Sequence, residues 1–245
     1  MSSPYSESSA ALNLVPRIDT VLFDYGQVLS NPPDPAAWAQ LRSITGLDED
    51  TLHKAYWKFR HDYDSGALTG PAYWYAVTAN SGIDLDAVRL SALLAADVDL
   101  WTSLNQPMVE WAGRLQDAGV RTGILSNIGD SIADGIIARL PWLARFDYCT
   151  WSHAMLMAKP EPAIYIRTAE ALTTPPAHIL FIDDREENIT AANTLGFQTL
   201  HFTTFSAFEC EMRERGFASL LNPGRAQNQS STVPDPRLAS EHAIK

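Results

Sequence analysis

A short apolar run that ends in a carboxylate constrains the fold of this chain more than any other stretch. The run Thr20–Phe23 is followed by Asp24 and, two residues later, by Gly26. Such a run is typical of a short strand buried on both faces, which has no room for an ionised side chain in its middle. We therefore expect Asp24 at the carboxyl end of the strand, where open α/β sheets bind ligands, although capping of a turn explains the run alone equally well.

Beyond residue 107 the chain alternates between helical and strand-like segments. Helical spacing and capping residues predict helices over residues 108–118, 130–140, 160–172, 186–195 and 205–215. Apolar runs predict strands over residues 120–125, 146–151, 178–182 and 198–202. Because strands that alternate with helices form parallel sheets, the predicted fold class is α/β, a Rossmann-like parallel sheet with helices on both faces.

The segment between the first strand and this alternating region has a different character. It is rich in aromatic residues and shows helical spacing, as at Trp38, Leu41 and Ile44. We predict an inserted α-helical cap over residues 33–103 and an α/β core made of residues 14–32 and 104–222. Residues 1–13 and 223–245, which are rich in small or polar residues, are predicted to be flexible tails.

Composition narrows the classes of partner and location. The formal net charge of −11 makes nucleic acid and anionic membranes poor partners, so an anionic substrate must be attracted by local donors or by a cation. No run reaches membrane-spanning length and the N-terminal stretch lacks a secretory pattern, so we expect a cytoplasmic protein, as a monomer or a homodimer. The cysteines, Cys149 and Cys210, are expected to be buried thiols and not metal ligands.

Polar residues stand at the ends of several predicted strands or at the start of the helix that follows. They are Asp24, Ser126 with Asn127, Lys159, and Asp183 with Asp184. Because the carboxyl ends of parallel strands meet in one crevice, we expect these side chains to converge. A carboxylate nucleophile, neutral donors, a cation and a carboxylate pair suit phosphoryl transfer.

Each residue of this set has a role in such chemistry. Asp24 can attack phosphorus and form an aspartyl phosphate, and Asp24 and Asp184 can bind Mg²⁺ through oxygen. Ser126 and Asn127 precede a predicted helix and can donate hydrogen bonds to the phosphate oxygens. Lys159 can neutralise charge on the nucleophile and on the transferring group.

This ordered set resembles the motifs of the haloacid dehalogenase (HAD) superfamily over residues 18–216. The matching segments are Phe23-Asp24-Tyr25-Gly26-Gln27-Val28, Leu125-Ser126-Asn127, Lys159-Pro160-Glu161-Pro162, and Phe181-Ile182-Asp183-Asp184 with Asn188. The helical insert is similar to the small α-helical cap of subfamily I of this superfamily.

The resemblance implies a phosphomonoester hydrolase that requires Mg²⁺ and acts on a small phosphorylated metabolite, with a sugar 1-phosphate as one candidate. Its catalytic residues would be Asp24, the nucleophile, and Lys159. The residues that the resemblance assigns to the metal are Asp24, Asp184 and the carbonyl group of Gly26 as ligands, with Asp183 and Asn188 orienting the metal waters and Lys159.

Gly26 departs from the pattern of most phosphatases in this superfamily, which have a second Asp there as general acid and base. Loss of general acid–base catalysis typically lowers the rate by about 10²–10⁴-fold. Some similar proteins, among them bacterial α-glucose-1-phosphate phosphatases, have glycine at this position. We hypothesise that Gly26 favours acidic leaving groups, such as sugar 1-phosphates or acyl phosphates; otherwise another group must supply the proton.

The same departure leaves a metal-independent 2-haloacid dehalogenase as an alternative function, because those enzymes also lack the second Asp. The pair Asp183-Asp184 argues against it, as does the absence of an arginine in Asn31-Pro32-Pro33-Asp34. A catalytically weak binding protein with this fold is a second alternative.

The segment 56–63 of the predicted cap combines aromatic residues and cations. Arg60 in this segment is a candidate for binding a sugar or a second anionic group of the substrate. A surface position for Arg60, with Trp57 and Phe59 packing the cap, is the simpler interpretation.

Overall fold

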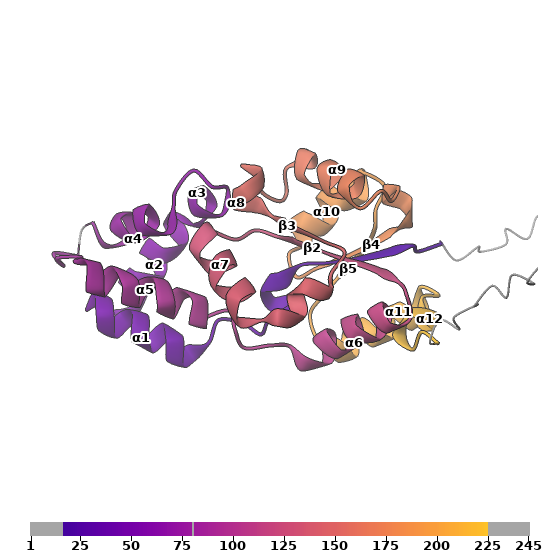
Figure 1. Cartoon of the computed structure of the whole chain (residues 1–245), viewed down its shortest axis with the longest axis horizontal. Helices are drawn as coiled ribbons and strands as arrows, with labels where there is room; N and C mark the ends of the chain where they lie inside the picture. The colour runs from indigo at the N-terminus through magenta and orange to yellow at the C-terminus, as the bar shows by residue number, and fades with distance from the viewer. Residues whose placement is uncertain (1–16, 80, 225–245) are drawn as a thin grey trace, which may run out of the picture.

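The computed structural model describes residues 17–79 and 81–224, so the predicted tails lie outside the described residues apart from residues 223 and 224. A parallel sheet with the strand order β3-β2-β1-β4-β5 forms the centre of the molecule (Figure 1). The strands are β1 (Thr20–Phe23), β2 (Arg121–Ser126), β3 (Tyr148–Trp151), β4 (Ile179–Asp183) and β5 (Gln198–His201). This architecture confirms the predicted α/β class.

The central strand β1 is paired on both sides, which explains its continuous apolar sequence. Leu22 is in register with Gly123 of β2 and with Phe181 of β4. Because all the strand pairs are parallel, their carboxyl ends lie along one edge of the sheet.

Helices cover both faces of the sheet, as Figure 1 shows. One face packs against α6 (Gln106–Asp117), α7 (Asp130–Arg139), α11 (Phe205–Glu214) and α12 (Ala218–Leu221), and the other against α9 (Pro162–Ala171) and α10 (Glu186–Thr194). Successive residues of β1 serve opposite faces, since Phe23 belongs to the first core and Leu22 to the second. Helix α8 (Ser152–Met155) and the 3₁₀ turns Pro141–Arg145 and Pro176–His178 complete this part. The predicted helices and strands of this region are present, with ends that differ by a few residues.

Five of the helices between β1 and β2 lie beyond the carboxyl edge of the sheet (Figure 1). They are α1 (Pro35–Thr45), α2 (Glu49–Lys58), α3 (Arg60–Asp64), α4 (Gly70–Thr78) and α5 (Ala87–Asp99). Their interior is aromatic: Tyr63 and Tyr73 are stacked with ring centroids 4.5 Å apart, and Trp74 is fully buried beside them. We call these five helices the cap.

The chain enters and leaves the cap through two segments that are paired with each other. The backbone N–H of Asn31 donates to the Ser103 carbonyl at 2.8 Å, and the backbone N–H of Asn105 donates to the Leu29 carbonyl at 2.9 Å. This pairing fixes the position of the cap above the strand ends.

The cap also packs closely on α7. A Cβ atom at Gly129 would lie 2.1 Å from Cε2 of Tyr63, and one at Gly135 would lie 2.4 Å from Cγ2 of Val98. Only glycine leaves room for these cap side chains against the backbone at Gly129 and Gly135. The Gly70 amide, in addition, donates to the Asp130 carboxylate at 2.8 Å.

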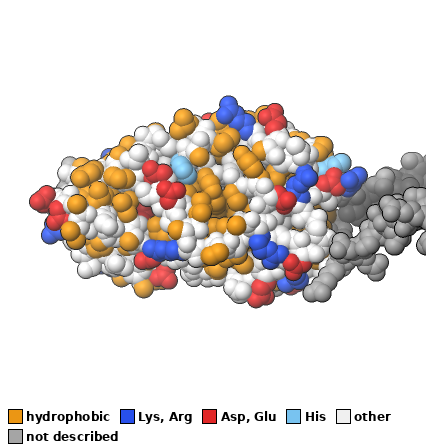
Figure 2. Space-filling view, in the orientation of Figure 1, with side chains coloured by type: hydrophobic (Ala, Val, Ile, Leu, Met, Phe, Trp, Pro, Cys, Tyr) orange, Lys and Arg blue, Asp and Glu red, His pale blue; other side chains and the backbone are white. Residues whose placement is uncertain are grey.

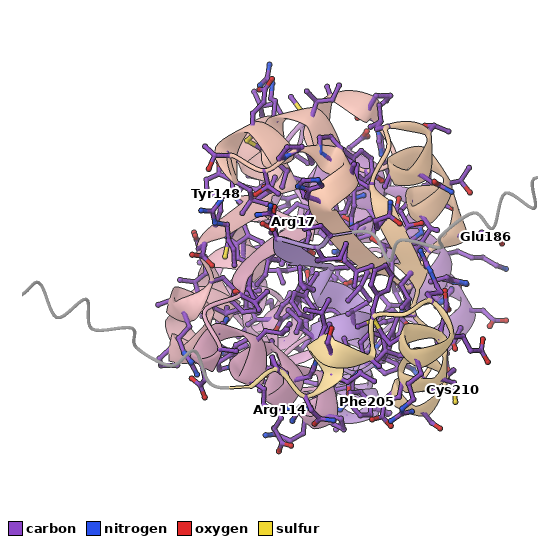
Figure 3. All side chains as sticks on the ribbon, turned by 90° about the vertical axis from the view of Figure 1, so that its right-hand side faces the viewer. Arg17, Arg114, Tyr148, Glu186, Phe205 and Cys210 are labelled. Carbon is purple, nitrogen blue, oxygen red and sulfur yellow. The ribbon has the colours of Figure 1, made fainter. Side chains whose placement is uncertain are left out.

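The surface carries charged side chains of both signs among apolar ones, as Figure 2 shows for one face. Cys210, labelled in Figure 3, is exposed on α11 and Cys149 is half-buried, so the expectation of burial was wrong for Cys210. The reason is helical phase, because Phe208 and Met212 turn inward and place Cys210 on the opposite side of the helix. In the described part of the chain, we find no helix with the length and hydropathy of a membrane span.

Candidate active site

The carboxyl ends of β1, β2 and β4 border a cavity of about 90 Å³ between the sheet and the cap. Asp24 follows β1, Ser126 ends β2, and Asp183 ends β4. All but one of the residues nominated from the sequence line this cavity; they are Asp24, Gly26, Arg60, Ser126, Asn127, Lys159, Asp184 and Asn188. Asp183 is fully buried directly behind it.

Lys159 is the cation at the base of the cavity. Its side chain is 1% exposed, and its Nζ lies 2.6 Å from Oδ2 of Asp183 and 3.0 Å from Oδ1 of Asp24. Burial disfavours the ammonium ion, but the two carboxylates outweigh this effect and hold the pKa of Lys159 above its ordinary value. Lys159 therefore remains charged.

Asp24 is held in place by its own neighbours. Its amide donates to the Ile182 carbonyl at 2.8 Å, and its Oδ1 accepts a hydrogen bond from the Tyr25 amide at 2.6 Å. Burial raises the pKa of Asp24 to about 8; Lys159 opposes this rise, while the charges of Asp183 and Asp184 add to it. A cation bound beside Asp24 would favour its ionised form.

Asp183 has its two oxygens occupied by hydrogen bonds. Oδ2 faces Lys159, whereas Oδ1 accepts from the Arg185 amide at 2.8 Å and from Nδ2 of Asn188 at 2.9 Å. These contacts suit a residue that positions Lys159 and Asn188, and they leave Asp24 and Asp184 better placed to bind a ligand.

Asp24, Asp183 and Asp184 each present an oxygen atom, and these atoms all lie within 4.8 Å of one another. Oδ2 of Asp184 also accepts a hydrogen bond from Nε2 of Gln27 at 2.8 Å. Three clustered carboxylates with a single lysine leave excess negative charge when all are ionised, and carboxylate oxygens are the donors that Mg²⁺ prefers. The residues present therefore fit a divalent cation at this position.

Asn127 has a role that the sequence did not indicate. Its Nδ2 donates to the Lys159 carbonyl, and its Oδ1 accepts from the Lys159 amide, both at 2.8 Å. This reciprocal pair fixes the backbone of Lys159 from a strand end 32 residues earlier in the chain.

The cap contributes a buried ion pair to the cavity. Arg60 is only 7% exposed, so the interpretation of Arg60 as a surface residue was wrong. Its Nη2 lies 2.9 Å from Oδ1 of Asp64, and its Nη1 donates to the Tyr56 hydroxyl at 2.6 Å. Asp97, fully buried, lies 3.9 Å from Nη1 on the side of the cap interior. The i,i+4 spacing of Arg60 and Asp64 was the one sequence signal for this pair.

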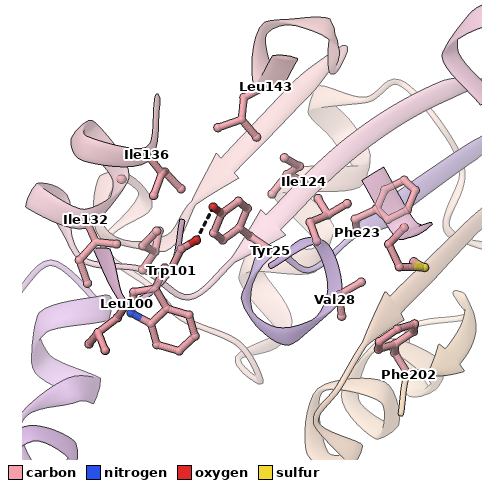
Figure 4. Packing of buried hydrophobic residues seen from close by; sticks show 14 of the residues in the cluster. Phe23, Tyr25, Val28, Leu100, Trp101, Ile124, Ile132, Ile136, Leu143 and Phe202 are labelled. Carbon is pink, nitrogen blue, oxygen red and sulfur yellow. Dashed lines mark hydrogen bonds between the residues drawn. The ribbon is translucent and has the colours of Figure 1, made fainter. Parts of the chain in front are cut away.

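Gly26 faces an aromatic wall. A Cβ atom at Gly26 would lie 3.6 Å from Cζ3 of Trp101, which is ordinary contact. The Tyr25 hydroxyl donates to the Trp101 carbonyl at 2.7 Å, as Figure 4 shows, and this hydrogen bond holds the Trp101 backbone in place. Neither Trp101 nor Asp64 was nominated from the sequence. Asp64 comes from the cap and Trp101 from the segment that follows α5, and only tertiary packing brings them to the cavity.

Comparisons with known proteins agree with this geometry. A family model for haloacid dehalogenase-like hydrolases matches residues 18–196. The solved structure of a HAD family enzyme from Bacteroides thetaiotaomicron has a TM-score of 0.68 at 20% identity, covering 80% of this chain and 99% of that chain. The L-2-haloacid dehalogenase from Xanthobacter autotrophicus has a TM-score of 0.58 at 18% identity, covering 83% of this chain and 86% of that chain. At these identities the similarity shows the fold.

Among curated proteins, drimenol cyclase drtB from Aspergillus calidoustus is 22% identical over 225 residues, which cover 89% of this chain and 41% of that protein. The chain spans 18–41% of the length of the first curated relatives that it matches.

The sheet, the cap and the aspartate at the end of β1 define a protein of the α/β class with its candidate site under a helical cap. Since the family model covers well over half of its length, the chain belongs to the haloacid dehalogenase-like hydrolases.

Proposed function

We propose that this hydrolase is a phosphatase that requires Mg²⁺ and cleaves phosphomonoesters through an aspartyl phosphate on Asp24. The observation that carries the proposal is the cluster of Asp24, Asp183 and Asp184, two of which pair with Lys159, at the floor of the cavity. A dehalogenase that uses no metal has no need for this excess of carboxylates.

The residues divide the work as follows. Asp24 attacks phosphorus, and Lys159 stabilises the charge that is shared between the nucleophile and the transferring group. Ser126 and the backbone of Asn127 donate to the non-bridging oxygens at the strand end that precedes α7. When bound by Asp24, Asp184 and the Gly26 carbonyl, Mg²⁺ would supply charge neutralisation that lets an anionic nucleophile approach an anionic phosphate.

Two findings support the metal. The donor set fits a hard cation, and the Bacteroides thetaiotaomicron enzyme of similar fold has been solved in complex with magnesium and inorganic phosphate. Asp183 and Asn188, which hydrogen-bond each other at 2.9 Å, would orient the metal waters and Lys159.

The substrate that we propose is a small phosphorylated metabolite, because the cavity measures about 90 Å³. Arg60 and Trp57 at its cap side would contact the leaving group. A sugar 1-phosphate is one candidate, since its leaving oxygen is more acidic than that of an alkyl phosphate. Exclusion of nucleic acid and membrane, a monomeric or homodimeric state and a cytoplasmic location remain predictions from the sequence.

A metal-independent 2-haloacid dehalogenase remains the second candidate. It is favoured by the structural similarity to the Xanthobacter autotrophicus enzyme and by glycine at position 26. It predicts halide release from 2-haloacids without added metal.

The test is a panel of phosphorylated metabolites, with p-nitrophenyl phosphate included, assayed with Mg²⁺ and with Asp24→Asn as the matched blank. We expect turnover that EDTA abolishes and Mg²⁺ restores, and a loss of at least about 10³-fold in Asp24→Asn. Halide release without metal would establish the dehalogenase instead. A stably folded protein with no turnover of either substrate class would indicate a binding protein.

A further inference from the structure

The proposed phosphatase chemistry leaves one proton unassigned. When phosphorus leaves an alkyl oxygen, that oxygen needs a proton, and Gly26 has no side chain to supply it. The space next to Gly26 is bordered by the Trp101 ring, and the ring atom that faces Gly26 is a carbon that cannot act as an acid. The donor must therefore be sought elsewhere on the cavity wall.

Among the described residues that line the cavity, the ionisable side chains fall into two groups. Asp24, Lys159 and Asp184 belong to the nucleophile and metal end, and the others are Arg60, Asp64 and Arg185. Arginine does not release its proton at neutral pH. The Tyr25 hydroxyl is already engaged with the Trp101 carbonyl, and burial raises its pKa far above neutrality. Asp64 is thus the carboxyl group on this wall that the nucleophile and metal do not use.

The position of Asp64 is set by contacts with both the cap and the core. It ends α3, and its carbonyl accepts a hydrogen bond from the Ser152 hydroxyl of the core at 2.5 Å. Its side chain is 14% exposed and rests on Arg60, with Nε of Arg60 3.3 Å from Oδ2. Oδ1 lies 2.9 Å from Nη2 of Arg60, yet it is buried and accepts no well-aligned hydrogen bond from the described residues.

We propose that Asp64 is the general acid and base of this hydrolase, in place of the carboxyl group that Gly26 lacks. The inference rests on the proposed phosphatase function. Its geometry is a carboxyl group fixed at the junction of cap and core, on the wall of the cavity that contains the nucleophile.

The proton balance of both steps closes on Asp64. In the first step the Asp24 carboxylate bonds to phosphorus, the bond from phosphorus to the leaving oxygen breaks, and that oxygen takes the Asp64 proton to leave as an alcohol. In the second step Asp64 takes a proton from water as the water oxygen bonds to phosphorus. The bond from phosphorus to Asp24 then breaks, which releases phosphate and regenerates both carboxyl groups.

The surrounding charges are compatible with this exchange. Burial raises the pKa of Asp64, and the opposing cations are Arg60, His61 and Arg185. Arg60 is shared with the carboxylate of Asp97, so its charge is not reserved for Asp64. Arg185 is further neutralised by an ion pair with Glu187.

The experiment compares kcat/KM for p-nitrophenyl phosphate and for an unactivated alkyl phosphate in Asp64→Asn. Because kcat/KM reports the steps up to release of the leaving group, it isolates the first proton transfer. We expect a loss of about 10²–10³-fold for the alkyl phosphate, and a loss at least tenfold smaller for p-nitrophenyl phosphate, whose leaving group needs little protonation.

Asp97→Asn is the matched control, because Asp97 also pairs with Arg60 but does not line the cavity. Asp97→Asn should change kcat/KM for the two substrates by the same factor. If Asp64→Asn also lowers kcat/KM for the two substrates by the same factor, the proposal is overturned, and Asp64 serves only as the ion-pair partner of Arg60. Absence of phosphatase activity in the wild type would instead refute the proposed function.

A second measurement needs no folded variant. In the wild-type protein, log kcat/KM for a series of aryl phosphates should depend only weakly on the pKa of the leaving group, as expected when the leaving oxygen is protonated in the transition state. A steep dependence would show an unprotonated leaving group and would equally overturn the proposal.

Discussion

Replacement of Lys159 by Met should destabilise the metal-free protein by about 3–5 kcal/mol at pH 8.5, as is typical when one member of a buried ion pair is removed. The Lys159 side chain is 1% exposed, and its partners Asp24 and Asp183 are 9% and 0% exposed. Methionine retains most of the lysine volume, so the predicted loss comes from uncompensated charge and not from a cavity.

The loss should depend on pH in a direction that the structure determines. Burial already raises the pKa of Asp24 to about 8 with Lys159 present, and removal of Lys159 raises it further. A carboxyl group with a raised pKa in the folded state contributes its full stability below its unfolded pKa of 3.8, and that stability is lost as the pH rises through the folded value. The free energy of unfolding of the variant should thus be closest to that of the wild type at pH 5 and furthest below it above pH 8.

The assay is urea unfolding in EDTA at pH 5 and pH 8.5, followed by tryptophan fluorescence. Lys54→Met is the control, because Lys54 is an exposed residue on α2 and its removal should change the free energy of unfolding by at most about 0.5 kcal/mol. A deficit for Lys159→Met below about 1 kcal/mol at pH 8.5, or the same deficit at both pH values, would refute the electrostatic argument.

Three further substitutions replace glycines. Gly26→Asp should fit, since its Cβ would only contact Trp101 at 3.6 Å. Kinetic assays should show a larger gain in turnover for alkyl phosphates than for sugar 1-phosphates, and the gain should be largest when Asp64→Asn is also present. Equal gains for the two substrate classes would argue against a leaving-group effect. Gly129→Ala would place its Cβ 2.1 Å from Tyr63 and should destabilise by about 1–3 kcal/mol. Gly113→Ala, in α6, would place its Cβ in ordinary contact with Nη1 of Arg145 at 3.7 Å and should stabilise by about 0.5–1 kcal/mol. A thermal melt in which Gly129→Ala and Gly113→Ala shift in the same direction would contradict the packing.

The floor of the candidate site could be predicted because it depends on strand ends. Asp24, Ser126 and Asp183 each terminate or follow a strand whose apolar run is legible in the sequence, and parallel pairing then brings them together. The position of Lys159 followed in the same way from the helix that it precedes. The local sequence pattern of strands and helices was therefore enough to predict where these residues lie.

The roof of the cavity was beyond such an argument. Arg60 lies on a short helix of five residues, and its burial depends on the rings of Tyr56, Tyr63 and Trp101, which come from three different cap segments. No periodicity encodes how those segments stack. Helical spacing therefore predicted that a cap exists but not which of its faces meets the strand ends.

The balance of charges in the cavity, and not Arg60 alone, indicates the class of substrate. At the floor, three carboxylates cluster beside a single lysine that pairs with two of them, so when all are ionised a phosphate dianion would be repelled unless a divalent cation is bound first. At the roof, Arg60 faces both Asp64 and Asp97 and thus offers no net positive charge for a second anion. A neutral leaving group, such as a sugar or another polyol, fits this balance better than a second phosphate or a carboxylate. Metal should therefore bind before substrate, and bisphosphates should be poorer substrates than monophosphates of the same polyol.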